Sequence, residues 1–384
     1  MLRWLTSGES HGPQLTVVIE GLPAGLEISE EELRRDLARR QGGHGRGGRQ
    51  KIETDVARIV SGVRGGYTLG SPLTLVLENK DHANWTAQMT AAKEGFEPKP
   101  VTRLRPGHAD LAGALKYGHT DIRNVLERSS ARETATRVAA GGVARKLLSR
   151  FGVEILSFTQ SIGTVDMGYD SGDPESVKLE DIEASPVRCP DPEASRRMVE
   201  LIDEVTELGD TLGGTFRVVA RGVPIGLGSF VHWDRKLDGR LAQAVLSINA
   251  IKAVEFGAGF EGAARRGSDF HDQIDFEGGR FRHLTNRAGG LTGGVTNGEP
   301  IDLRVAIKPI STMKKPMMSI DLKTKEKTEA HYERSDVCVV PAAGVIGEAM
   351  VALTLADAFL EKFGGDSMAE LERNYRTYLE SIAQ

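Results

Sequence analysis

Short stretches in which apolar and polar residues alternate, or β-branched residues follow one another, predict the β-strands of this chain. A further strand is expected around Val56, Ile59, Val60 and Val63. The clearest predicted strands cover residues 15–20, 73–77, 153–158, 215–220 and 302–307. Because these strands do not alternate regularly with helices, the pattern predicts an α+β fold built in layers.

Longer segments carry apolar residues at helical spacing, and several of them are rich in Ala and Gly. Helices of that kind can pack closely and be buried on most sides. Capping boxes predict the N-termini of two helices, one formed by Ser29 with Glu32 and the other by Ser130 with Glu133. The predicted helices occupy residues 30–41, 133–150, 238–256 and 341–363.

One internal repeat is visible. Residues 12–26 align with residues 213–227 at a constant offset of 201, with seven identities in fifteen positions. Each copy is expected to be a strand that ends in a Gly-Pro turn and precedes a helix. Chance similarity between common turns is the alternative to duplication. We favour duplication, and thus a single pseudo-symmetric domain over residues 1–384, with halves that start near residues 12 and 213.

Composition narrows the class of protein. The chain has 384 residues, 39% of them hydrophobic and 27% charged, which is typical of a globular protein with ample core. No run approaches ~18 consecutive apolar residues, so no membrane-spanning helix is expected. The polar N-terminus is unlike a secretory signal, and the two cysteines fit a reducing cytoplasm.

Two segments are expected to lie on the surface. Residues 166–195 are acidic and contain prolines, which predicts a solvated insertion without a catalytic role. Residues 311–327 contain five lysines and three methionines, which is typical of a mobile loop. Such a loop is either inert or a lid over an anionic ligand.

The most distinctive chemistry lies in residues 39–51, where five cations and one histidine are interleaved with five glycines. A flexible linker would have such a composition, but the segment leaves a well-marked helix and is followed by a strand. Arginine forks bind phosphate and carboxylate through paired hydrogen bonds. The net charge of -5 and the lack of aromatic residues in this loop argue against a nucleic-acid surface. We therefore expect a local anion site.

Other polar motifs accompany this loop. His11 follows a Gly-rich turn, and His108 follows Pro-Gly with Asp110 close behind, so both imidazoles suit acid–base chemistry. Residues 128–135 combine two arginines with hydroxyl groups at a helix start, which favours anion binding. Asp336 lies just before another helix. No metal-ligand spacing, nucleophile elbow or nucleotide-binding glycine loop is present.

Together these segments resemble the chorismate synthase family. They occur in the family's order, span nearly the whole chain, and depart from the family only slightly near Gly293 and at Gly347. The segments are SGESHG at 7–12, RRQGGHGRGGRQKIE at 39–53, LRPGHADL at 104–111, RSSARETA at 128–135, GGLTGGVTNGEPI at 289–301, KPIST at 308–312 and RSDVCVVPAAGVIGEAM at 334–350.

The resemblance implies a reaction and a cofactor. Members of the family eliminate phosphate and a C6 hydrogen from 5-enolpyruvylshikimate 3-phosphate to form chorismate, and they require reduced FMN without net redox change. His11 would protonate the departing phosphate. His108 would stabilise the reduced flavin by proton transfer. Asp336 would act with flavin N5 in removing the C6 proton.

The resemblance also implies two sets of binding residues. The anionic ligands would be clamped by Arg40, Arg46, Arg49, Arg132 and Arg334. The flavin would be contacted by Arg128, Ser129, Ser130, Asn249, Ala250, Gly293, Lys308, Pro309, Ile310, Ser311, Thr312 and Arg334.

The family fold is a β-α-β sandwich with a core of long helices between antiparallel sheets, internal pseudo-two-fold symmetry and a homotetrameric assembly. Some members reduce their own flavin with NADPH. No extra insertion is identified in this chain, so we expect an external flavin reductase. An ordinary FMN oxidoreductase is the alternative enzyme class, and it would consume reducing equivalents.

Overall fold

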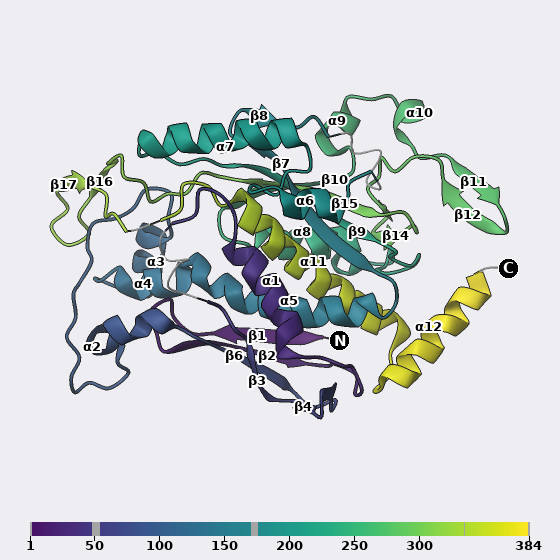
Figure 1. Cartoon of the computed structure of the whole chain (residues 1–384), viewed down its shortest axis with the longest axis horizontal. Coiled ribbons are helices and arrows are strands. Elements are labelled where there is room, and N and C mark those ends of the chain that lie inside the picture. The colour runs from purple at the N-terminus through teal and green to yellow at the C-terminus, as the bar shows by residue number, and fades with distance from the viewer. Residues whose placement is uncertain (1, 48–53, 170–175, 334, 383–384) are drawn as a thin grey trace.

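Two antiparallel sheets enclose a layer of helices in the computed structural model, which describes residues 2–47, 54–169, 176–333 and 335–382 (Figure 1). In spatial order, the four-stranded sheet contains β1 (Arg3–Ser7), β2 (Gln14–Glu20), β6 (Leu73–Glu78) and β3 (Arg58–Ser61). The five-stranded sheet contains β10 (Ile251–Phe256), β15 (Ile301–Ile307), β9 (Gly214–Arg221), β7 (Glu154–Ile162) and β8 (Val165–Asp166).

The helical layer is built around two long helices, α5 (Thr134–Ser149) and α11 (Val340–Phe363). α5 packs on β1, β2 and β6, whereas α11 packs on β7 and β9. The remaining longer helices are α1 (Glu30–Gln41), α3 (Asp110–Tyr117), α4 (Arg123–Ser129), α7 (Pro192–Glu207), α8 (Leu237–Leu246) and α12 (Met368–Ile382). The expected core of long helices between antiparallel sheets is therefore observed.

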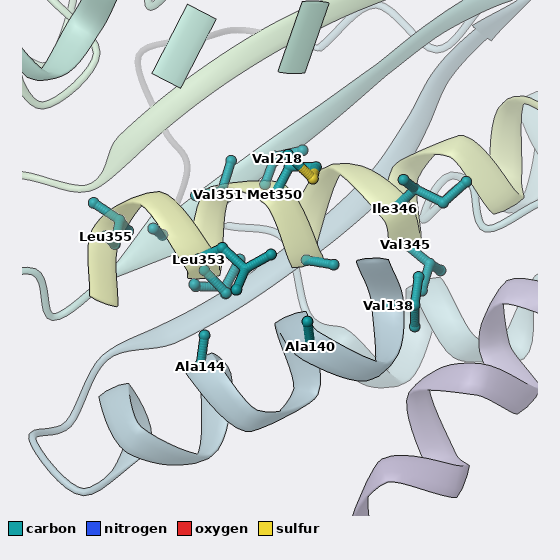
Figure 2. Packing of buried hydrophobic residues seen from close by; sticks show 14 of the residues in the cluster. Val138, Ala140, Ala144, Val218, Val345, Ile346, Met350, Val351, Leu353 and Leu355 are labelled. Atoms are coloured by element: carbon teal, nitrogen blue, oxygen red, sulfur yellow. The ribbon is translucent and has the colours of Figure 1, made fainter. Parts of the chain in front are cut away.

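Small side chains bring the two long helices together. A Cβ on Gly141 of α5 would lie 2.3 Å from the Cβ of Ala349 on α11, so a larger residue at position 141 would push the helices apart. Figure 2 shows Val138, Ala140 and Ala144 of α5 facing the apolar side chains of α11. α11 has the length and apolarity of a membrane span, but 89% of its most apolar window is buried within the structure. It is a core helix here.

Short elements connect these layers. The shorter helices are α2 (Thr86–Met89), α6 (Leu179–Ala184), α9 (Gly259–Ala263) and α10 (Gly267–Phe270), with 3₁₀ turns η2 (Lys80–Asn84), η3 (Ala131–Glu133) and η4 (Trp233–Arg235). Four hairpins stand apart from the main sheets: β4 (Val63–Arg64) with β5 (Tyr67–Thr68), β11 (Ile274–Glu277) with β12 (Arg280–His283), β13 (Leu291–Thr292) with β14 (Val295–Thr296), and β16 (Met318–Ile320) with β17 (Lys327–Glu329).

The five clearest predicted strands are confirmed as β2, β6, β7, β9 and β15, and three of the four predicted helices are confirmed as α1, α5 and α11. The capping box of α1 is present, with the side chains of Ser29 and Glu32 each bonded to the other's backbone N–H. The second capping box is wrong. Ser130 accepts a hydrogen bond from the backbone N–H of Arg132 at the start of η3, and α5 begins only at Thr134.

The predicted helix 238–256 is also wrong in its second half. α8 ends at Leu246, Ala250 has a φ of +69°, and residues 251–256 form β10 along the edge of β15. A left-handed residue cannot continue a right-handed helix. The β-branched residues that follow are better satisfied by pairing with β15, which the local pattern could not reveal.

The two halves of the chain share one connectivity. In the first half, β1, β2, α1, β3, the β4–β5 hairpin and β6 follow in order, and β7, β9, α8, β10, the β13–β14 hairpin and β15 follow in the second. The matching sheet orders are β1-β2-β6-β3 and β7-β9-β15-β10. Apart from the further elements inserted in the second half, the two halves share a strand order, which supports the proposed duplication.

A repeated threonine bond supports this correspondence. The hydroxyl of Thr68 accepts from the N–H of Leu26 and donates to the carbonyl of Pro23. In the second half, Thr296 makes the same two bonds to Leu227 and Pro224. Residues 61–73 and 289–301 share six identities in thirteen positions around these threonines, at an offset of 228.

The expectation that residues 166–195 form only a solvated surface is wrong for the described part of that segment. Ile182, Val187 and Cys189 are buried in the apolar core. Arg188 is 6% exposed, and its Nη2 lies 3.3 Å from an oxygen of Glu348, a fully buried residue of α11. An acidic, proline-bearing sequence does not reveal such a partner 160 residues away.

Residues 311–327 are more ordered than a free loop. They include β16 and lead into β17, and Figure 1 shows this hairpin at one end of the molecule. The hydroxyl of Ser319 donates to the carbonyl of Leu104 at 2.6 Å, and the N–H of Leu322 donates to the carbonyl of Thr102. The hairpin is therefore anchored on the segment that precedes His108.

Candidate active site

His11 lies in the turn between β1 and β2 and is held by a buried carboxylate. Its backbone N–H donates to Glu127 Oε2 at 2.7 Å, and its Nδ1 lies 2.8 Å from Glu127 Oε1. The imidazole lies against the ring of Trp85, with centroids 4.1 Å apart. Burial alone would raise the pKa of Glu127, but its hydrogen bonds with His11 outweigh burial and lower it. We infer that Nδ1 carries the proton toward this carboxylate, so that Nε2, which lies 4.0 Å from Asp81 Oδ2, is the ring nitrogen that can act on a ligand.

Arg123 forms the next link of this group. Its Nη1 lies 3.4 Å from Glu127 Oε1, and its guanidinium stacks over Trp85 at 5.0 Å from the ring centre. Its Nη2 lies 2.8 Å from Glu333 Oε1. Arg123 and Glu127 are four residues apart on α4, so one helix face presents both charges.

His108 is held in a similar way on a different segment. Its Nδ1 lies 2.7 Å from Asp110 Oδ1, and Arg105 donates to both oxygens of the same carboxylate from Nε and Nη2. Burial would raise the pKa of Asp110, but the hydrogen bond with His108 and the charge of Arg105 outweigh it and lower the pKa. The predicted proximity of His108 and Asp110 is thus observed, with Arg105 as an additional member.

Glu333 lies between the two histidine groups. Its Oε1 is 2.8 Å from Arg123, its Oε2 is 3.8 Å from Arg105, and His331 lies 3.5 Å from Oε1. Burial would raise the pKa of Glu333, but the bond with His331 and the charges of both arginines lower it to about 2. This carboxylate is therefore ionised at neutral pH.

Two arginines of the predicted clamp share one buried carboxylate. Arg40 lies at the end of α1 and Arg132 in η3, and both point a guanidinium nitrogen at Asp55. Arg40 also donates to the hydroxyl of Thr134 at 3.0 Å, and Arg132 donates to Asn79 Oδ1 at 2.9 Å. Burial lowers the pKa of Arg40 to about 10, a value at which the guanidinium still stays charged at neutral pH. The pair concentrates positive charge around the shared carboxylate of Asp55.

Arg46 and Asp336 form a third contact. Arg46 Nη1 lies 2.9 Å from Asp336 Oδ2, and the N–H of Gly47 donates to Asp336 Oδ1 at 2.5 Å. The glycine-rich loop thereby holds the carboxylate that the resemblance implies in removal of the C6 proton. Ser335 anchors the same stretch by donating to the carbonyl of Thr312 at 2.6 Å.

Not every cation of the basic loop faces a ligand. Arg39 points inward and donates two hydrogen bonds of 2.8 Å to the buried Glu348. His44 pairs with Asp203 at 2.6 Å. Arg49 lies outside the described residues, as does Arg334.

The predicted flavin contacts at residues 308–312 lie beside His108. A Cβ on Gly107, whose φ is +77°, would be 3.4 Å from the Cβ of Ser311 and 3.6 Å from Lys308 Nζ. The left-handed backbone at this position favours glycine, and the two distances are ordinary van der Waals contacts. Lys308 donates to the carbonyl of Gly107 at 2.8 Å, and partial burial lowers the pKa of its ammonium. Pro309 and Ile310 continue this segment, and the carbonyl of Ile310 accepts a bond from Thr211.

A cavity of about 320 Å³ opens next to this segment. Its lining contains Ser311, three cationic side chains (Arg103, Lys314 and Lys315) and one carboxylate (Glu329), besides apolar residues. Its basic lining suits an anionic ligand.

Further predicted contacts meet on the other side of α4. Asn249 Nδ2 donates to the carbonyl of Ser129, and the neighbouring Ala250 accepts a bond from the N–H of Lys308. The buried Oδ1 of Asn249 has no hydrogen-bond partner in the described part of the chain. Arg128 is directed to the carbonyl groups of residues 6 and 8.

Gly293 is not brought to this region within one chain. It lies at the turn of the β13–β14 hairpin, where an added Cβ would be 4.0 Å from Phe230. Figure 1 shows β14 well separated from α3 and α4.

Sequence reasoning missed several members of the site. Arg105 lies within the motif at 104–111, but the sequence assigns it no role. Arg123 and Glu127 lie four residues apart just before the motif at 128–135, and this helical spacing could have indicated that they form a pair. No local signal identifies Asp55 or Glu333, because each acts on residues far away in the sequence.

Comparisons with known proteins agree over the whole chain. The chorismate synthase family model matches residues 2–360. Relatives named chorismate synthase occur in Desulforudis audaxviator, 57% identical over 384 residues, and in Geobacter metallireducens, 56% identical over 392 residues. The alignments cover 100% of this chain with 98% and 99% of these relatives, respectively. A crystal structure of chorismate synthase matches 100% of this chain and 98% of its own, with a TM-score of 0.81 and 44% identity. The chain therefore belongs to the chorismate synthase family and is a lyase.

Proposed function

We propose that this chain converts 5-enolpyruvylshikimate 3-phosphate to chorismate by 1,4-anti elimination. The C3–O bond to phosphate and the C6–H bond break, the electrons form a new double bond, and no net oxidation occurs. The observation that carries the proposal is one connected polar region with two carboxylate-held imidazoles, His11 and His108, and the buried cations Arg40 and Arg132.

The charged groups fit the substrate. Its two carboxylates and one phosphate need permanent cations, and an arginine keeps its charge even when buried. Arg40 and Arg132 share Asp55, and the charge of Arg46 in the basic loop acts on Arg40. These three residues would bind the substrate, with Arg49 and Arg334 as further proposed members outside the described residues.

His11 is proposed to act as the general acid. With Nδ1 turned to Glu127, a protonated ring can donate its Nε2 proton to the departing phosphate. Trp85 covers one face of the ring and limits its rotation. Asp336, held by Arg46 and Gly47, is proposed to receive the proton that leaves C6.

The residues present fit reduced FMN. The cavity beside Ser311 carries three cationic side chains, and the buried Oδ1 of Asn249 has no hydrogen-bond partner among the described residues, so it can accept from a donor. Residues 128–130, 249–250 and 308–312 would hold the cofactor, with Arg334 and Gly293 as further proposed contacts. When bound, reduced FMN would supply electron density that eases loss of the allylic phosphate. His108 would hold a proton next to it, oriented by Asp110.

Several partner assignments belong to the same proposal. We place the enzyme in the cytoplasm as a pseudo-symmetric single-domain subunit of a homotetramer, without nucleic-acid or membrane partners. Its flavin would be reduced by an external reductase, with NADPH as the alternative direct reductant. The shared connectivity of the two halves supports the pseudo-symmetry.

Anaerobic turnover tests the reaction. The purified protein is given the substrate with catalytic amounts of chemically reduced FMN, and phosphate and chorismate are followed together. Equal release over many turnovers per flavin is expected. Stoichiometric oxidation of flavin would instead indicate the oxidoreductase class, and absence of phosphate release from flavin-binding protein would reject the substrate.

A further inference from the structure

Glu333 connects two histidine groups that come from separate parts of the chain. On one side it pairs with Arg123, which pairs in turn with the carboxylate that holds His11. On the other side it faces Arg105, which binds the carboxylate that holds His108. One carboxylate thus lies at the centre of a chain of charged groups that ends in an imidazole at each side.

This placement is unusual for a residue that only stabilises the fold. The side chain of Glu333 is 30% exposed, and the apolar core lies elsewhere, so it adds little to packing. A carboxylate near a site for a highly anionic substrate also repels that substrate. Its presence there calls for a compensating role.

The two arginines explain that role. Arg105 is 5% and Arg123 14% exposed, and like charges in such places repel each other unless a carboxylate lies between them. Without Glu333, Arg123 would keep Glu127 as its near carboxylate and would be drawn toward it. Arg105 would keep Asp110 as its near carboxylate, beside its contacts with Thr312 and with the ring of His108 itself. Glu127 orients His11 and Asp110 orients His108, so a shift of either arginine would also shift a histidine.

We propose that Glu333 is a positioning residue that fixes His11 and His108 relative to each other through Arg123 and Arg105. It does not touch the reacting atoms. The inference rests on the proposed function for the roles of the two imidazoles. The coupling itself is a property of the protein without ligand.

The first test measures that coupling directly. The protein is labelled at histidine, and the ring resonances of His11 and His108 are followed by NMR at one pH in the ligand-free state. Glu333→Gln, which keeps the size but removes the charge, should move both resonances. Glu326→Gln, which removes an exposed charge on the β16–β17 hairpin seven residues before Glu333, is the matched control and should move neither.

The second test measures the consequence for the reaction. Glu333→Gln should lower kcat about tenfold or more while the affinity for FMN changes by less than about twofold. Glu333→Asp retains the charge and should restore part of kcat. It also keeps the test decisive if the Gln variant folds poorly.

The outcomes separate this inference from the proposed function. Movement of only one histidine resonance, or of neither, overturns the coupling whatever the enzyme turns over. Unchanged kcat in Glu333→Gln overturns the positioning role. If the wild-type protein releases no chorismate, the proposed function fails, and the NMR result still decides whether Glu333 links the two rings.

Discussion

Glu348 and Glu333 each contact several cationic side chains, but they differ in burial and in the residues to which those cations connect them. Glu348 is fully buried on α11 and accepts bonds from Arg39, Arg145 and Ser157 at 2.6–2.8 Å, with Arg188 at 3.3 Å. Glu333 is 30% exposed, its contacts range from 2.8 to 3.8 Å, and its arginines lead to imidazoles. A cluster of charges therefore does not identify a site by itself. Access and a titratable partner distinguish the two.

The largest expected effect comes from breaking the Glu348 cluster. Glu348→Ala leaves three arginines close together without their shared carboxylate. Loss of one partner from a buried ionic cluster costs about 3–5 kcal/mol, which we expect in the free energy of unfolding measured with denaturant. Glu372→Ala, which removes an exposed pair with Arg150, is the control and should cost at most about 1 kcal/mol. Equal losses in both variants would contradict a structural role for Glu348.

The second-largest expected effect is a loss of stability at acidic pH, when Glu348 becomes protonated. Burial would raise the pKa of Glu348, but Arg39 and Arg145 lower it from 4.5 to about 2. A carboxyl with a depressed pKa stabilises the fold above its ordinary pKa, and that stability is lost as the pH falls toward the folded value. We expect about 3 kcal/mol to be lost between pH 4.5 and 2. Urea unfolding across this range should show a flatter profile for Glu348→Gln than for the wild type, and parallel profiles would refute the assignment.

The site should respond in rate rather than in stability. His11→Ala removes the proposed acid, and loss of general acid catalysis should lower kcat by at least about 10²-fold. FMN affinity and the free energy of unfolding should change little, because the ring is at the edge of the core. His232→Ala, at an exposed imidazole paired with Asp234, is the control. Loss of FMN affinity with nearly normal saturated turnover would show that the role given to His11 is wrong.

The smallest effect concerns residues 311–327. We propose that this lysine-rich segment becomes more ordered when flavin and substrate bind, because it borders the basic cavity. Trypsin cleavage at Lys323, Lys325 or Lys327 should then slow when both ligands are present. Unchanged cleavage would indicate that the anchored hairpin does not respond to ligands.

Local pattern gave much of the fold. The alternation of β2 and β15, the capping box of α1 and the Ala/Gly content of α5 and α11 are properties of short stretches, so the sequence shows them directly. The failure at 251–256 has a physical cause. A short apolar segment can form either a helix or a strand, and here it pairs with the free edge of β15 in the folded chain.

The motifs, together with the resemblance to the chorismate synthase family, placed His11, His108, Arg40, Arg132 and Asp336 among the candidates. Only the tertiary structure decided their partners. Glu127 reaches His11 across 116 positions, and Asp55 reaches Arg132 across 77. It also decided that Arg39 binds the buried Glu348 while Arg40 binds Thr134 and Asp55. The sequence gives the charge of two adjacent arginines but not the side of the helix on which each lies. Packing of the helix decides which partners each side chain reaches.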